Sequence, residues 1–258
     1  RHRFTASPED SSLSAFAFAA SSGDALGVVF EDDRDSSPQR ASWFARLDAK
    51  DRAVTQTWTV PIVEDATTRA RESSIAWSPT RGQWAIASVE RGVTTLHFVA
   101  ASGQRLGSCV VARGGADSSR ASRLVWAGDR WALAVADGST LHLVTVRGFG
   151  MDPDDLVVAE NVYADMTLDW DGAGYGVAWR SAAGGVYYQR WAEGRAVHPP
   201  RVVSAARWAS QPTLAWNGHA HVLVWNEQKD RVPSVCVSAT YLVMTGTPEI
   251  PPARAPSV

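Results

Sequence analysis

The sequence predicts an all-β protein built from five copies of one repeat. Four copies end a short apolar run in Trp, at positions 77, 126, 170 and 216, which lie between 44 and 49 residues apart. A weaker copy comes first and has Phe18 in the place of Trp. No stretch of ten or more residues has a helical period. Repeats of about 45 residues with β character are typical of propeller blades, so we predict a five-bladed β-propeller.

The first half of each copy predicts a tight β-hairpin. In the last copy, an apolar run ends at Trp216, Asn217 and Gly218 follow, and a second apolar run ends at Trp225. Asn-Gly and Asp-Gly pairs favour the positive φ angles of hairpin turns. Both runs are almost continuously apolar, as expected for strands covered on both faces by neighbouring blades.

The second half of each copy predicts two further strands. A third run, such as Thr95–Val99 or Val186–Arg190, is followed by a polar turn with Gly and a fourth short run. Four short strands per repeat are the pattern of an antiparallel propeller blade. We therefore expect a single domain over 1–258, with blades at approximately 12–65, 73–115, 121–163, 165–205 and 210–250.

Large aromatic side chains fill the space between packed blades, because each buries roughly 150–250 Å². We expect one ring of inter-blade residues at the repeat anchors and a second ring at the end of the second strand. The second ring is less aromatic at Ser88 and Val135, where Trp84 and Trp131 could supply bulk. The two rings comprise positions 18, 77, 126, 170 and 216, and positions 30, 88, 135, 179 and 225.

A propeller must also close its ring, because an open edge strand favours aggregation. Residues 1–7 resemble the tail of a repeat and are our candidate for the closing strand. The alternative is 247–258, whose four Pro residues suit an edge or a linker better.

The repeat, Leu-x-Trp-x-Gly followed by a second run ending in Trp, resembles the Trp-rich propeller repeats of large secreted bacterial proteins. The acidic loop of that pattern is clearest at 30–35, and its third strand at Val186–Arg190. The chain lacks the motifs of WD and kelch repeats and the Asp-box of sialidases. The resemblance implies a secreted or cell-envelope location in a bacterium, with a signal peptide outside this sequence. The near-absence of Lys among the basic residues also indicates a bacterial genome rich in G and C.

Composition excludes several classes of partner. The net charge is −2 and acids and bases are interspersed, so no basic patch predicts binding to nucleic acid or to an anionic membrane. No apolar run approaches the roughly 18 residues of a membrane span. Cys109 and Cys236 fall in non-adjacent blades, and we expect two free, mostly buried thiols. No cofactor motif is present.

Catalysis has little support in the sequence. A glycosidase needs two carboxylates about 5–10 Å apart, and the inner strands offer only Asp169, where other copies have Ala or Val. Asp169 is either a buried, paired structural group or a ligand contact. We assign no catalytic residue, and we take Asp169 and Arg123, in the equivalent run of the preceding copy, as candidate ligand contacts.

Two clusters raise the question of a metal. Asp32, Asp33 and Asp35, with Glu31, could supply oxygen ligands to Ca²⁺, but they lack the spacing of a known calcium loop, which favours a solvated turn. His219 and His221 lie on one face of a strand and could share a metal. The alternative is a packed His221 with an exposed His219, and we assign no metal site.

A long segment, Arg147–Glu160, interrupts the third copy where other copies have a short turn. It places Phe149 and Met151 in an acid-flanked loop, and exposed apolar residues on insertions often contact ligands. Packing onto a neighbouring blade is the alternative reading.

These observations together favour a monomeric, non-catalytic propeller that binds a protein or a glycan partner without a cofactor. The alternatives are a carbohydrate-active enzyme and a purely structural domain of a longer protein.

Overall fold

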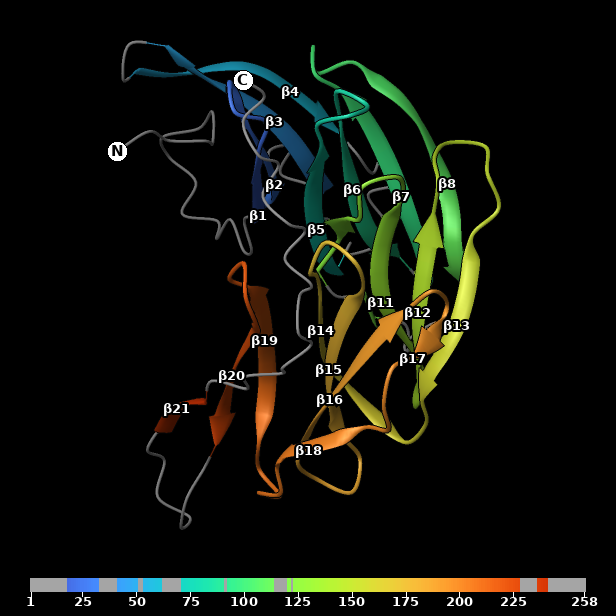
Figure 1. The fold of residues 1–258 in the computed structure, drawn as a ribbon. Helices are drawn as coiled ribbons and strands as arrows, with labels where there is room; N and C mark the ends of the chain where they lie inside the picture. Colours follow the sequence, from blue (N-terminus) through green and yellow to red (C-terminus); the bar gives the residue numbers. More distant parts are fainter. Residues whose placement is uncertain are drawn as a thin grey trace, which may run out of the picture.

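The computed structural model of the chain describes residues 18–32, 41–50, 53–61, 71–90, 92–113, 120–121, 123–227 and 236–240. Every regular element in these ranges is a β-strand, which confirms the all-β class (Figure 1). None of the described residues belongs to a helix with the length and apolar character that a membrane crossing requires.

The described strands form five antiparallel sheets, numbered here along the chain. Sheet 1 contains β1 (Phe18–Ser21), β2 (Ala25–Asp32), β3 (Ala41–Lys50) and β4 (Ala53–Pro61). Sheet 2 contains β5 (Arg71–Ser78), β6 (Gln83–Glu90), β7 (Val93–Ala100) and β8 (Arg105–Arg113). Sheet 3 contains β9 (Arg120–Ala121), β10 (Val125–Trp126), β11 (Trp131–Asp137), β12 (Thr140–Val146) and β13 (Asp154–Ala159).

Sheets 4 and 5 complete the described part of the chain. Sheet 4 contains β14 (Val162–Trp170), β15 (Tyr175–Ser181), β16 (Val186–Ala192), β17 (Arg195–Ala196) and β18 (Arg201–Ser204). Sheet 5 contains β19 (Ser210–Trp216), β20 (His221–Glu227) and β21 (Cys236–Thr240). Within each sheet the strands pair with their neighbours in the sequence, apart from the short strands β9 and β18.

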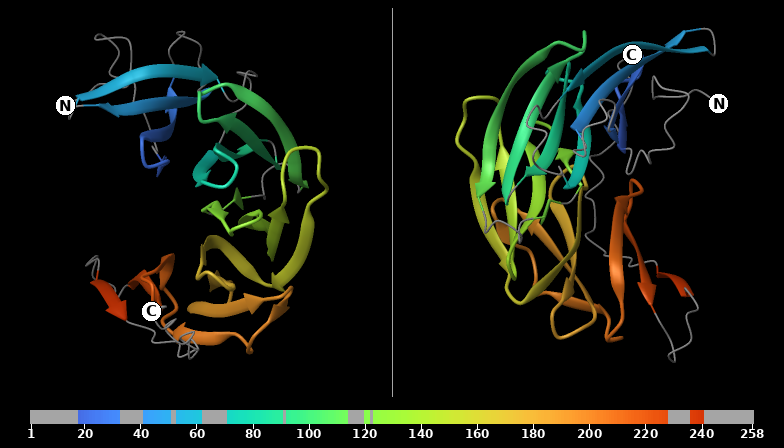
Figure 2. Two further views of the ribbon diagram at one scale, coloured as in Figure 1. Left: turned by 45° about the horizontal axis from the view of Figure 1, so that its top comes forward. Right: turned by 180° about the vertical axis from the view of Figure 1, so that it is seen from behind.

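The sheets stand radially around a common axis, which is the arrangement of a β-propeller. Figure 2 shows them as an arc, with sheet 1 and sheet 5 at its two ends. Each sheet packs on the next through its first strand, in the order β1, β5, β10, β14 and β19. Both segments considered for ring closure, 1–7 and 247–258, lie outside the described residues, so the closing strand and the count of five blades stay predictions.

The first hairpin turns have the predicted chemistry. In sheet 4, the Asp171 side chain accepts hydrogen bonds from the backbone N–H groups of Ala173 (2.9 Å) and Gly174 (2.6 Å). Gly172 takes a φ of 94°, which favours Gly. Asn217 and Gly218 form the same turn in sheet 5, with a φ of 95° at Gly218.

The expectation that the anchor residues fill the space between sheets is corrected by the structure. The described anchors are Trp77, Trp126, Trp170 and Trp216. These four side chains are only half-buried. Each contacts the residue near the start of the next strand, which we call the wedge position, at ring centroid distances of 4.5 to 5.1 Å. The wedge residues are Trp84, Trp131, Tyr175 and His221.

The most deeply buried residues at the wedge position are Trp84 and Trp131, which are fully buried. The indole N–H of Trp84 donates to the carbonyl of Ala20 in sheet 1 (3.3 Å), and its ring centroid lies 5.4 Å from that of Phe44. The ring centroid of Trp131 similarly lies 6.3 Å from that of Phe98 in sheet 2. The wedge residue therefore fills the space between sheets and the anchor covers it.

The second predicted ring is interior. Phe30, Ser88, Val135, Trp179 and Trp225 are all buried. At Ser88 the hydroxyl hydrogen-bonds to Nε2 of His97 (2.9 Å), so a polar pair takes the place of an aromatic ring.

The segment Arg147–Glu160 is not one long loop, contrary to the prediction. Its second half is β13, which pairs with β12, and only 147–153 connects the two strands. Asp154 and Asp155 begin β13 and are exposed, because this is the outer strand of sheet 3. Charged residues on an outer edge protect it from pairing with other chains. Because they interrupt the apolar run, the sequence pattern did not predict a strand here.

Of the two cysteines, only the Cys109 side chain lies in the described part of the structure. It is a free thiol and is half-buried, and burial raises its pKa. The Cys236 side chain lies outside the description.

Candidate functional site

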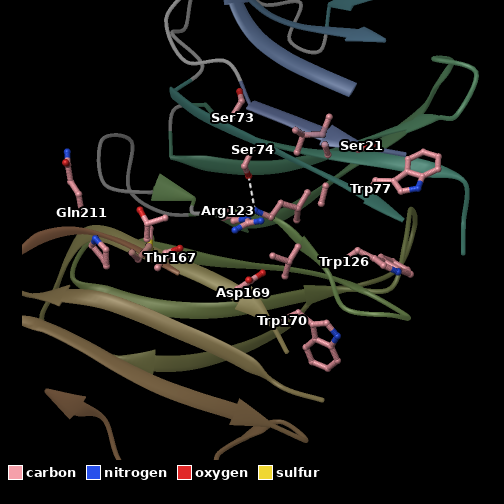
Figure 3. Close-up of a pocket in the computed structure, with 18 of the residues that line it drawn as sticks. Ser21, Ser73, Ser74, Trp77, Arg123, Trp126, Thr167, Asp169, Trp170 and Gln211 are labelled. Atoms are coloured by element: carbon pink, nitrogen blue, oxygen red, sulfur yellow. Dashed lines mark hydrogen bonds between the residues drawn. The ribbon is translucent and has the colours of Figure 1, made fainter. Parts of the chain in front are cut away.

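The first strands of the five sheets line an axial channel of about 920 Å³ (Figure 3). Its wall combines small hydroxyl side chains, three indoles and a few charged groups. Both Asp169 and Arg123 line this channel, so the structure brings together two of the four candidate ligand contacts.

Hydrogen bonds between neighbouring first strands hold the channel wall together. Ser74 of β5 accepts from the backbone N–H of Leu124 (3.1 Å), and Thr167 of β14 accepts from that of Leu214 (3.3 Å). Ser74 and Thr167 occupy the same position of the repeat. These contacts, which we call inner-edge bonds, satisfy N–H groups that would otherwise point into the channel.

Asp169 makes a third inner-edge bond. Its Oδ2 accepts from the backbone N–H of Trp216 in β19 at 2.6 Å. The carboxylate thus joins sheet 4 to sheet 5, which agrees with the structural reading of this residue.

Arg123 is exposed to the channel and reaches across it. Its Nη1 donates to the carbonyl of Leu214 (3.3 Å), so a side chain from sheet 3 meets the first strand of sheet 5. A guanidinium has five N–H donors, and this one is held where a molecule in the channel would meet it.

Three anchor indoles, Trp77, Trp126 and Trp170, lie together along one side of the channel in Figure 3. We call them the indole rim. They come from β5, β10 and β14 at one repeat position and are half-buried. The guanidinium of Arg81 lies 5.5 Å from the Trp126 ring centroid. One side of the channel is therefore aromatic, whereas the wall beside it is polar.

The described channel wall contains two carboxylates, of which the sequence indicated only Asp169. The other is Asp165, which pairs with Arg180 at 3.5 Å. It lies in β14 at an irregularity between Val162 and Met166, outside the repeat alignment, which is why the pattern did not reveal it. Both carboxylates thus have structural partners.

Phe149 and Met151 lie away from the channel, on the connection between β12 and β13. Their side chains are 60% and 52% exposed. The Phe149 ring lies against Gly107 of β8, where an added Cβ would come within 2.7 Å of the ring. Part of the Phe149 ring therefore contacts the neighbouring sheet, and ligand contact by Phe149 and Met151 stays a prediction.

The two groups of residues considered as metal ligands are the pair His219 and His221 and the acidic cluster at 31–35. His221 is buried and its Nδ1 lies 2.9 Å from the Tyr188 hydroxyl, whereas His219 is exposed, so the packed-histidine reading is confirmed. Burial lowers the pKa of His221. Among the described side chains no three His, Cys, Asp or Glu residues lie close enough to share a metal ion. The side chains of Glu31, Asp32, Asp33 and Asp35 fall outside the description.

Comparison with known proteins supports the fold and little more. No family model and no curated protein matches the sequence. A solved protein from Lactobacillus plantarum aligns at 13% identity over 86% of this chain and 69% of its own, with a TM-score of 0.54. An acylaminoacyl peptidase from Pyrococcus horikoshii aligns at 11% identity over 83% and 36%, with a TM-score of 0.52.

A sialidase from Trypanosoma rangeli aligns at 8% identity over 83% of this chain and 42% of its own, with a TM-score of 0.50. The chain therefore spans less than half the length of the two enzymes. At these identities the likeness shows a shared β-propeller architecture, and architecture alone does not select a function.

Proposed function

We propose that the protein is a non-catalytic propeller that binds a glycan in its axial channel, across the indole rim. The observation that carries the proposal is the combination of half-buried indoles with hydroxyl groups and Arg123 in one hollow of about 920 Å³. Ligand pockets have this size and place a few polar groups among aromatic side chains. A sugar ring matches this lining, because it offers C–H groups to an indole face and hydroxyls to polar side chains.

A peptide partner added as a strand fits the channel less well. Strand addition needs unpaired backbone groups on an exposed edge. The N–H groups of Leu124, Leu214 and Trp216 already donate to side chains of the preceding sheet. These inner edges offer fewer donors to an incoming strand, which favours a ligand that bonds to side chains.

The same contacts count against hydrolysis. A glycosidase uses one carboxylate to protonate the leaving group and a second as nucleophile or base. Asp169 accepts a hydrogen bond from a backbone N–H of the next sheet, and Asp165 forms an ion pair with Arg180. Each carboxylate already has a structural partner, which favours binding without chemistry, and that is the function we propose. The resemblance of the repeat to those of secreted bacterial proteins supports a secreted or cell-envelope location.

A glycan array followed by calorimetry tests the proposal. We expect the array to show selective binding, and we expect Trp126→Ala and Arg123→Gln each to lower the affinity for the strongest array glycan at least tenfold. Trp208→Ala is the matched control, because this indole is 56% exposed and lies outside the channel lining. Melting temperatures show whether each variant is folded.

Two results would contradict the proposal. One is an array without any bound glycan. The other is wild-type affinity in both folded channel variants.

A further inference from the structure

A second hollow of about 470 Å³ lies between sheet 3 and sheet 4. Aromatic rings form part of its wall, and a group of charged side chains forms another part. The rings are those of Trp170, Tyr175 and Trp191, and the charged residues are Asp129, Arg130, Asp154, Asp155 and Glu193. We call this hollow the sheet 3–4 groove.

Arg130 organises the charged part of the groove. Its Nε and Nη2 donate to the two carboxylate oxygens of Asp129, both at 2.9 Å. Its Nη1 lies 3.8 Å from Oδ2 of Asp154. Hydrogen bonding to Arg130 lowers the pKa of Asp129, so the pair stays ionised at neutral pH. The groove therefore presents fixed N–H donors next to carboxylate acceptors.

The rings of the groove are held in position as well. The Trp191 indole N–H donates to Oε1 of Gln189 (3.1 Å), and Nε2 of that buried amide donates to the carbonyl of His198 (2.8 Å). The ring centroids of Trp170 and Tyr175 lie 4.7 Å apart. Burial raises the pKa of Tyr175 to about 12, so its hydroxyl keeps its proton and remains a donor.

We infer that the sheet 3–4 groove binds a second, uncharged sugar residue against Trp191, with sugar hydroxyls bonded to the Arg130–Asp129 pair and to Asp154. The inference rests on the proposed function in taking the ligand to be a glycan. A polyhydroxylated ring needs donors and acceptors side by side beside an aromatic face, and the groove has all three. Four of the five charged lining residues are acidic, which disfavours a sugar that carries a carboxylate.

The groove and the channel are separate but adjacent. Trp170 is the only residue that lines both among the described residues. Substitutions at Arg123 and Asp154 therefore affect one hollow each, and their effects can be measured independently.

The test is titration calorimetry with neutral sugars and their uronic acids, namely glucose and galactose against glucuronic and galacturonic acid. We expect a neutral sugar to bind at two sites and its uronic acid to bind at least tenfold more weakly at one of them. Asp154→Asn and Trp191→Ala should each lower the affinity of that site at least tenfold, whereas Arg123→Gln should leave it unchanged. Asp152→Asn is the matched control, because Asp152 is exposed just before β13 and does not line the groove.

The outcomes separate the two proposals. Loss of a site in Asp154→Asn and Trp191→Ala, but not in Asp152→Asn, supports the inference, and it does so even where Arg123→Gln has no effect and the channel proposal fails. Wild-type binding of both neutral sugars by folded Asp154→Asn overturns it, as does equal binding of uronic acids. Absence of binding to all four sugars also overturns it. Asp154 is 68% exposed, so its substitution tests the groove without emptying the core.

Discussion

Two interfaces of the propeller fill the same repeat position with different chemistry. Between sheets 2 and 3 the wedge residue is Trp131, which is fully buried against Phe98. Its indole N–H has no hydrogen-bond partner among the described residues. Between sheets 4 and 5 the wedge residue is His221, which is also buried but bonds to the Tyr188 hydroxyl. The first interface is filled by an indole whose N–H is unsatisfied, and the second by an imidazole that is hydrogen-bonded at Nδ1 while its Nε2 has no partner among the described residues.

The difference shows that the wedge position accepts rings of different size and polarity. At two of the described interfaces the backbone of the preceding sheet carries Gly where the wedge ring approaches it, whereas the same position is Ala85 in sheet 2 and Ala132 in sheet 3. An added Cβ at Gly27 would lie 2.6 Å from Trp84, and one at Gly176 would lie 2.8 Å from His221. Gly27 and Gly176 occupy the same repeat position, so the ring and the space for it belong to adjacent repeats.

The largest expected effect comes from emptying the apolar interface. Trp131→Ala should lower the free energy of unfolding by about 3–5 kcal/mol, because it leaves a cavity in a packed core. Urea denaturation measures the change, with Trp208→Ala as the control for an exposed indole, for which we expect at most about 0.5 kcal/mol. A loss below about 1 kcal/mol for Trp131→Ala would show that this indole does not hold the two sheets together.

The second prediction contrasts buried imidazoles with buried indoles, since only the former respond to pH. Burial, with a smaller contribution from the charge of Arg105, lowers the pKa of His97 in sheet 2 to about 4, and burial also lowers that of His221. Between pH 6.5 and 4 the unfolded chain binds protons that the folded chain does not. The free energy of unfolding should therefore decrease as the pH is lowered from 6.5 to 4, by on the order of 3 kcal/mol for His97.

Urea titrations between pH 4 and 8 measure this dependence. His97→Gln should remove the larger part of it and His221→Gln a further part. A pH dependence that is unchanged in both variants would contradict the assignment to these two rings.

The third prediction concerns the inner-edge bond between sheets 4 and 5. Asp169→Ala should lower the free energy of unfolding by about 1.5–3 kcal/mol, because the Trp216 N–H loses a charged acceptor. Asp169→Asn keeps an oxygen acceptor and should lose less. Thermal melts of both variants check the order, and equal stability of Asp169→Ala and the wild type would refute the structural role of this carboxylate.

The smallest effect belongs to an inner-edge bond between sheets 2 and 3. Ser74→Ala removes a neutral acceptor from the Leu124 N–H, and we expect about 0.5–1.5 kcal/mol. Measured beside Asp169→Ala, it tells whether the charged bond is the stronger of the two. A larger loss for Ser74→Ala would reverse that order.

The sequence revealed the fold through its repeated apolar runs and its turns. The Asp171–Gly172 and Asn217–Gly218 turns follow from local chemistry, and the hairpins on either side of them follow from strand periodicity. The anchors were visible because Trp recurs, but their partial exposure was not, since burial depends on the next strand and on the next sheet.

The candidate site was only partly visible. Asp169 and Arg123 lie on inner strands and were found, because the repeat places them there. Asp165 was missed because a strand irregularity shifts it out of alignment. Arg130, Asp154 and Trp191 were missed because they come from a turn, from the outer strand β13 and from the third strand of sheet 4, and only the packing of sheet 3 against sheet 4 brings them together.

The central claim is that the channel binds a glycan without transforming it. The most direct test is to incubate the protein with the strongest array glycan and to identify the recovered glycan by mass spectrometry. The account predicts that the glycan is recovered intact after prolonged incubation, while calorimetry of the same mixture shows it bound. Cleavage by the wild-type protein that disappears in a folded Asp169→Asn variant would contradict the account.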